Sequence, residues 1–217
     1  MDNRKIAFVC VAFGDKYVEQ QKTLKESIWS FYPNADLFFW TESLPISSKS
    51  FLESLYGFKP HSIAEPYNRG FTKVVFFDPA IILLDKLDFY DEYIKENGVL
   101  AIKDDTKLIN VTSNNCKKYF GINDEWIEGK NLVGGSFYYF DFENEKARNI
   151  FSEWKLAEEH GIFGSQDDLS KGLLQSHRND ETVMSICMYR NGVEPMSYSG
   201  SRYNWDANPI MIKKHFK

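Results

Sequence analysis

Apolar residues along the chain fall into short continuous runs that alternate with longer stripes at helical spacing. Residues 6–13 and 73–77 form runs with few polar positions, which is typical of strands buried on both faces of a sheet. Shorter runs predict further strands at residues 35–40, 81–84, 99–102 and 136–140. The chain is therefore expected to contain a sheet with several buried strands.

Apolar stripes between these runs predict amphipathic helices. One spans residues 17–31 and ends before Pro33, and two shorter ones are expected at 51–56 and 89–96. Asn144 is predicted to cap a helix that ends before Gly161, and Asn179 a last helix that ends before Gly192. Strands that alternate with helices favour an α/β fold with a mostly parallel central sheet flanked by helices.

Length and composition fit one globular domain. The 217 residues are 43% hydrophobic, and no linker or low-complexity tract divides residues 1–217, although this domain could belong to a larger protein. The net charge of −5 argues against a nucleic-acid or anionic-membrane partner. No stretch reaches the ~18 apolar residues of a transmembrane segment. The three cysteines have no metal-ligand spacing and suggest a reducing, cytoplasmic location.

Asp78 follows the buried run 73–77 directly and precedes Pro79. A buried charge without a partner costs several kcal/mol, roughly, so Asp78 is expected where the strand emerges at the carboxyl edge of the sheet. That edge is where open α/β sheets bind ligands. A solvated turn aspartate is the alternative interpretation.

Several common motifs are missing from the sequence. It has no phosphate-binding P-loop, no G-x-G-x-x-G after the first strand and no H-E-x-x-H. The four histidines are scattered, so a dedicated zinc site is not expected. These absences exclude most cofactor enzymes and simple hydrolases.

Five segments, taken in order, resemble nucleotide-sugar glycosyltransferases of the GT-A fold, of the glycogenin and galactosyltransferase type. The first is the opening IAFVCVAFGDKY, and the second, KVVFFDPAIIL, is similar to the strand that carries the Asp-x-Asp motif. The others are LVGGSFY, SHRNDET and the final IMIKKHF. The resemblance implies a single Rossmann-like domain that moves a sugar, such as a hexose, from a nucleotide-diphosphate donor to a glycan acceptor. A UDP-sugar is the favoured donor.

One position departs from the family pattern. Ala80 stands where the second aspartate of Asp-x-Asp ligates a divalent cation, Mn²⁺ or Mg²⁺, in the family. Asp78 and His215 would remain as metal ligands, so the cation binds weakly or catalysis proceeds without it. A catalytically inactive module that binds a nucleotide sugar or a glycan is therefore the alternative function. A sugar-binding module that ignores nucleotides is a third.

The resemblance also implies roles for individual residues. The donor site would use the residues Ala12, Phe13, Asp15, Tyr17, Arg69, Asp78, Ala80, Gly134 and Gly135. The first four would hold the nucleobase, Arg69 the ribose or diphosphate, and the two glycines would allow a sugar close to the backbone. Alternatively, Tyr17 begins a buried helical stripe, Arg69 is solvated and the glycines form a turn before a strand.

The catalytic carboxylate is expected in the pair Asp180 and Glu181. In a glycosyl transfer such a group acts as base, nucleophile or ion-pair stabiliser near the anomeric carbon. The alternative is that both acids only complement the macrodipole at a helix start. His177, Trp205 and Asp206 are the candidates for binding the acceptor.

Overall fold

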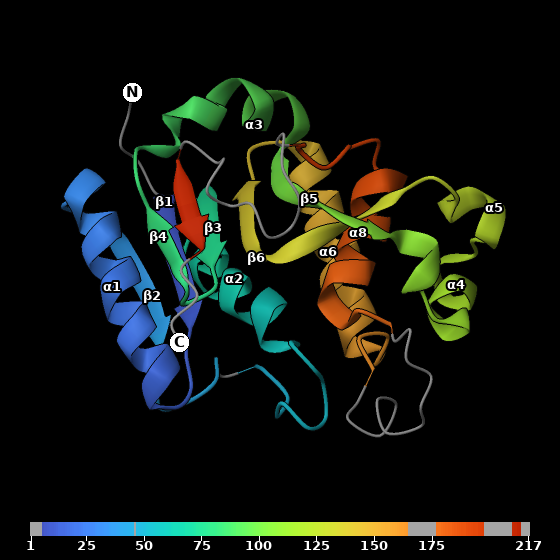
Figure 1. Ribbon diagram of the computed structural model, residues 1–217, viewed down its shortest axis with the longest axis horizontal. Helices are drawn as coiled ribbons and strands as arrows, with labels where there is room; N and C mark the ends of the chain where they lie inside the picture. The colour runs from blue at the N-terminus through green and yellow to red at the C-terminus, as the bar shows by residue number, and fades with distance from the viewer. Residues whose placement is uncertain (1–5, 46, 165–176, 198–209, 214–217) are drawn as a thin grey trace.

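The computed structural model describes residues 6–45, 47–164, 177–197 and 210–213. A five-stranded sheet has the order β2-β1-β3-β6-β5, and helices pack on both of its faces (Figure 1). The strands are β1 (Ile6–Val11), β2 (Asp36–Trp40), β3 (Lys73–Phe77), β4 (Ile81–Leu83), β5 (Val99–Lys107), β6 (Asn131–Asp141) and β7 (Met211–Lys213). The helices are α1 (Asp15–Phe31), α2 (Phe58–Asn68), η1 (Leu87–Tyr90), α3 (Asp91–Asn97), η2 (Leu108–Asn110), α4 (Asn114–Phe120), α5 (Asp124–Ile127), α6 (Glu145–Glu159) and α8 (Asn179–Arg190).

The central sheet is mostly parallel, as the sequence pattern indicates. β1 pairs in parallel with β2 and β3, whereas β6 pairs antiparallel with both β3 and β5. β6 alone therefore runs against the other four strands. We call the end formed by Val11, Trp40 and Phe77 the carboxyl edge, and the end formed by Ile6, Asp36 and Lys73 the amino edge.

Alternating residues of the buried strands supply two separate cores. Val74 and Phe76 of β3 pack in the cluster that includes residues of α2, α6 and α8. Val75 and Phe77 pack instead with residues of α1, α3 and β4. This two-sided burial explains why the run 73–77 has no polar alternation.

β4 and β7 form a small second sheet next to β3 (Figure 1). They pair antiparallel, and Ile81 lies opposite Lys213. The end of the described chain therefore approaches the segment that follows Asp78.

The structure corrects several predicted boundaries. The predicted helix at 51–56 is wrong: this segment is a series of turns, and the helix begins at Phe58. Pro60 lies in the first turn of α2, where a missing N–H costs little. Asn179 does not cap α8, because it has φ 44° and lies inside the helix, while Arg178 occupies the capping position. The first strand ends at Val11, and β5 and β6 extend well beyond their predicted limits.

Candidate functional site

Asp78 lies at the carboxyl edge, directly after β3. Its backbone N–H donates to Ser136 O of β6 at 2.8 Å, and its carbonyl accepts from Ile81 N–H at 3.1 Å. The residue is half-buried. Its charge contributes to raising the pKa values of Lys59, Tyr138 and Asp180. Asp78 therefore lies near enough to this buried cluster for its charge to act on these three groups, in addition to the larger effect of burial.

A buried ion pair between α2 and α8 forms the centre of this cluster. Lys59 Nζ lies 2.7 Å from Asp180 Oδ2, and the two side chains are 4% and 3% exposed. Lys59 also donates to Gly135 O at 2.9 Å, and the Tyr138 hydroxyl donates to Asp180 Oδ2 at 3.2 Å. β6 thus contributes to the surroundings of both charges.

Burial and the neighbouring charges act in opposite directions on the ionisation of this pair. It raises the pKa of Asp180 to about 6, against the opposing effect of the Lys59 ammonium. Burial lowers the pKa of Lys59, but Asp180, Asp78 and Glu181 raise it by more, so the net shift is upward. Lys59 therefore stays charged at neutral pH in a region crowded with carboxylates.

Glu181 lies beside the pair, and both of its carboxylate oxygens are bonded. Oε1 accepts from Gly135 N–H at 3.0 Å, and Oε2 accepts from Arg178 Nε and Nη2 at 3.0 and 2.8 Å. Its side chain remains 13% exposed. Of the two predicted catalytic acids, Glu181 is therefore the more accessible, and its orientation is fixed.

The two glycines lie inside β6, so the alternative of a turn before the strand is wrong. A Cβ on Gly135 would meet Lys59 Nζ at 2.7 Å, Glu181 Cγ at 2.9 Å and Asp180 Oδ2 at 3.0 Å. A Cβ on Gly134 would meet only Ile102 O, at 3.8 Å. Gly135 therefore makes room for the ion pair, a long-range reason that the local sequence does not reveal.

The predicted nucleobase residues gather at the same edge. Ala12 is buried and its N–H donates to Trp40 O at 2.9 Å. Phe13 and Tyr17 are 40% and 53% exposed, and Asp15 is exposed at the start of α1. Tyr17 does not begin the buried stripe of α1, whose buried residues start at Gln20.

Arg69 is not brought to this edge. It follows α2 next to Gly70 and the amino end of β3, whereas Asp78 follows the carboxyl end. Its guanidinium is bonded to Glu65 by Nη2 at 2.5 Å and Nε at 3.0 Å. Arg69 therefore lies apart from the other predicted donor residues, and its contact with the ribose or diphosphate stays a prediction.

The acceptor and metal candidates are only partly described. His177 Nε2 lies 2.7 Å from Ile162 O, which ties its ring to the loop after α6. Ala80 is half-buried and supplies no side-chain oxygen. Trp205, Asp206 and His215 lie outside the described residues. Among the described residues, no group of three His, Cys, Asp or Glu side chains could hold a metal ion.

Sequence reasoning missed Lys59, Arg178 and Tyr56. Tyr56 has φ 60°, a left-handed conformation that is strained for a tyrosine, and its side chain is 40% exposed. Lys59 Nζ lies 5.0 Å from its ring centroid. Burial raises the pKa of Tyr56, Lys59 lowers it, and Asp180, Asp78 and Glu181 raise it further. A local sequence signal was present only for Arg178, which lies three residues before Glu181.

A second buried cluster connects residues 47–57, the segment before α2, to α2 and α6. His61 Nε2 lies 2.9 Å from Glu158 Oε2 of α6, and His61 Nδ1 lies 2.8 Å from Ser47 Oγ. Lys49 Nζ lies 3.4 Å from Glu158 Oε1, and Leu55 N–H donates to Gly164 O at 3.4 Å. This cluster holds the segment that carries Tyr56 at the rim of the site.

No helix of the described part of the chain has both the length and the apolar character needed to cross a membrane. Comparison with known proteins gives no matching family model and no matching curated protein.

Solved structures do match. A glycosyltransferase involved in the glycosylation of the major capsid of PBCV-1 is 10% identical with a TM-score of 0.55, covering 92% of this chain and 82% of that one. The apo structure of the bifunctional glycosyltransferase WbbM is 16% identical with a TM-score of 0.53. That match covers 90% of this chain but only 39% of WbbM. At these identities the likeness concerns the fold, and this chain has the GT-A-type fold of these glycosyltransferases.

Proposed function

We propose that the protein transfers a sugar from a nucleotide-diphosphate donor, with a UDP-sugar favoured, to a carbohydrate acceptor. The observation that carries this proposal is the buried Lys59–Asp180 pair, with Glu181 and Asp78, at the carboxyl edge of the sheet. A buried ion pair is often no more stable than apolar residues of the same volume. Its presence at the edge where α/β sheets bind ligands therefore favours a functional role.

The transfer breaks the bond between the anomeric carbon and a diphosphate oxygen, which leaves with the electron pair. A new bond forms to an acceptor hydroxyl oxygen, whose proton passes to a carboxylate acting as base or to the departing diphosphate. Glu181 is the carboxylate assigned to the reacting sugar, because it is accessible and both oxygens are held. Asp180 is too buried for direct contact, so we assign it with Lys59 to positioning Gly135 and Glu181.

The other roles follow from position. Asp78 would accept hydrogen bonds from ribose or sugar hydroxyls, and Phe13, Asp15 and Tyr17 would hold the base against Ala12. Tyr56 would contact a sugar at the rim, because aromatic rings pack well against apolar sugar faces. His177, Trp205 and Asp206 remain the acceptor candidates.

A divalent cation fits this site poorly, because Ala80 provides no ligand and Asp78 is left with His215. When bound, Mn²⁺ or Mg²⁺ would neutralise the leaving diphosphate. The same deficit supports the second candidate function, a catalytically inactive GT-A-like module that binds a nucleotide sugar or glycan.

Thermal-shift measurements against UDP-, GDP- and dTDP-sugars, with and without Mn²⁺, test the proposal. We expect stabilisation by one donor and its loss in Asp78→Ala, while Asp105→Ala, an exposed aspartate, keeps it. Slow hydrolysis of the stabilising donor would separate an enzyme from an inactive module. Lack of stabilisation by every nucleotide sugar would contradict the transferase and any module that binds a nucleotide sugar, and would leave only a glycan-binding module.

A further inference from the structure

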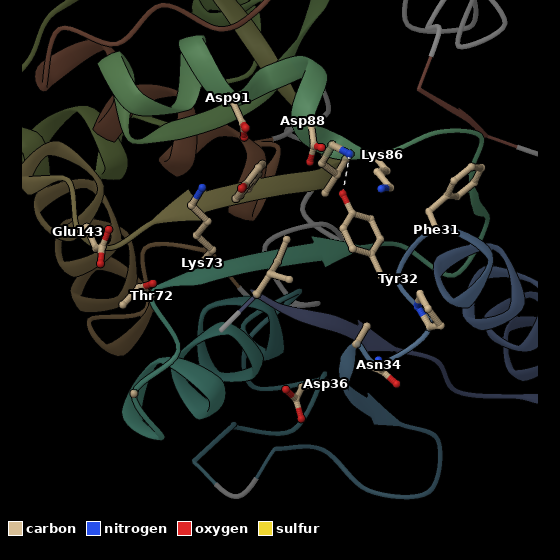
Figure 2. A pocket seen from close by; sticks show the side chains of 16 residues that line it. Phe31, Tyr32, Asn34, Asp36, Thr72, Lys73, Lys86, Asp88, Asp91 and Glu143 are labelled. Carbon is tan, nitrogen blue, oxygen red and sulfur yellow. Dashed lines mark hydrogen bonds between the residues drawn. The ribbon is translucent and has the colours of Figure 1, made fainter. Parts of the chain in front are cut away.

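A cavity lies at the amino edge of the sheet, away from the candidate site. It has a volume of about 1010 Å³ and is lined by the first residues of β1, β2 and β3, Ile6, Asp36 and Lys73. The end of α1 and the segment from η1 to α3 complete its wall (Figure 2). Five residues of β3 separate this edge from Asp78, which at ~3.3 Å per residue is roughly 16 Å. The cavity is therefore distinct from the proposed donor site.

Charged side chains of both signs line this cavity. The cations are Lys73 and Lys86, and the carboxylates belong to Asp36, Asp88, Asp91 and Glu143. Within the described part of the chain, none of these six side chains forms a hydrogen bond or ion pair. Figure 2 shows Asp88 and Asp91 extending toward the cavity from η1 and α3, and Lys73 extending toward it from β3. Their hydrogen-bonding capacity is therefore available to a ligand.

Aromatic side chains add an apolar surface and hydroxyl groups. Phe31 and Tyr32 come from the end of α1, and Tyr139 from β6. The Tyr32 hydroxyl accepts from Leu87 N–H at 2.7 Å. Burial, together with the charges of Asp88, Asp91 and Asp85, raises the pKa of Tyr32 to about 12, so the hydroxyl keeps its proton and can donate it.

This lining disfavours several classes of ligand. Four carboxylates against two ammonium groups repel a nucleotide diphosphate. A divalent cation needs several converging oxygen ligands, and the described residues contain no group of three acidic, histidine or cysteine side chains suited to one. A wholly apolar ligand would displace water from these charged groups without offering them a hydrogen bond.

Carbohydrate hydroxyls, by contrast, both donate to carboxylates and accept from lysines, and the C–H faces of a sugar pack on aromatic rings. The volume is at the upper end of the ~300–1,000 Å³ found for small-molecule sites. We propose that the cavity between α1, β3 and α3 binds a neutral oligosaccharide, independently of the donor site. This assignment does not require the protein to be a transferase.

The experiment uses the full chain on an array of neutral oligosaccharides that includes malto-, cello- and chito-tetraose. The strongest of these probes is then titrated calorimetrically. We expect saturable binding that weakens about tenfold or more in Asp91→Asn and in Lys73→Met. Glu92→Gln and Lys95→Met, exposed on α3 outside the cavity lining, are matched controls that should bind as wild type. Circular dichroism checks that each variant is folded.

Asp78→Asn distinguishes this site from the carboxyl edge, and it should keep the oligosaccharide affinity. The proposal is overturned if no probe binds, if the cavity variants bind as wild type, or if Asp78→Asn alone removes binding. Nucleotide-sugar stabilisation, measured separately, reports on the proposed transferase function, so the two can fail independently.

Discussion

Lys59 Nζ and Asp180 Oδ2 lie 2.7 Å apart with both side chains almost fully shielded, and the surface pair Lys117–Asp124 has the same separation with side chains that are 18% and 65% exposed. The two pairs therefore differ chiefly in burial and in the further hydrogen bonds of Lys59 and Asp180. Removing one partner of a buried pair costs ~3–5 kcal/mol, whereas an exposed pair contributes ~0–1 kcal/mol.

We therefore expect Lys59→Met to lower the free energy of unfolding by ~3–5 kcal/mol, because Asp180 would be buried without its cation. The double variant Lys59→Met/Asp180→Leu should lose less unfolding free energy than the two single variants lose in sum. Urea denaturation followed by circular dichroism measures each step, and Lys117→Met should change stability by ~1 kcal/mol at most. Additive losses at positions 59 and 180 would mean that the two charges do not stabilise each other.

Gly135→Ala should destabilise the fold by ~1–3 kcal/mol, because its methyl group would overlap Lys59, Glu181 and Asp180. Gly134→Ala is the matched control, with only Ile102 O near its Cβ. Differential scanning calorimetry of the two variants provides the comparison. Equal melting temperatures would show that the cluster yields easily to an added methyl group.

Tyr56→Gly should be more stable than Tyr56→Ala by about 1 kcal/mol, because glycine accepts φ 60° without strain. At Tyr17, which lies in α1, the alanine variant should instead be more stable than the glycine variant, because glycine costs ~1 kcal/mol relative to alanine in a helix. Chemical denaturation decides the order at both sites. The same order at positions 56 and 17 would argue against strain at Tyr56.

Acid should destabilise the protein partly through Glu158. Burial raises the pKa of this carboxyl, but His61, Ser54 and Lys49 together lower it by more, so the net shift is below its ordinary value of 4.5. Its stabilising contribution is then complete above pH 4.5 and is lost as the pH falls through the lowered value. Glu158→Gln should be less stable at pH 7 and depend less on pH below 4.5. Parallel stability–pH curves for the two proteins would exclude Glu158 as a source of acid sensitivity.

Glu181→Gln should reduce turnover far more than donor affinity, because it removes a charge assigned to the reacting sugar. Asp180→Asn should act in the same direction through positioning. Steady-state kinetics measures turnover, and donor titration measures donor affinity. Glu128→Gln, a substitution of an exposed residue, is the control. If both acidic variants kept full turnover, the catalytic carboxylate would lie elsewhere.

The sequence was informative where the signal is local. The run 73–77 predicted β3 to the residue and placed Asp78 at its end, because two-sided burial removes polar positions. The stripe before Gly161 likewise predicted α6 and its Asn144 cap, which accepts from Lys146 N–H.

Elements whose signal depends on distant packing were not predictable. α2 is buried nearly all round and contains Pro60 and Pro66, so it shows no amphipathic stripe. Lys59 was overlooked because lysine is rarely buried, and its partner Asp180 is 121 residues away. The left-handed conformation of Tyr56 has no sequence signature.

The missing side chain at position 135 has an evolutionary consequence. A descendant of this chain could gain a larger residue there only after positions 59 and 180 had shrunk or moved. A homologous chain with a larger residue at position 135 should therefore also differ at position 59 or 180, whereas positions 59 and 180 can change while glycine is kept at 135.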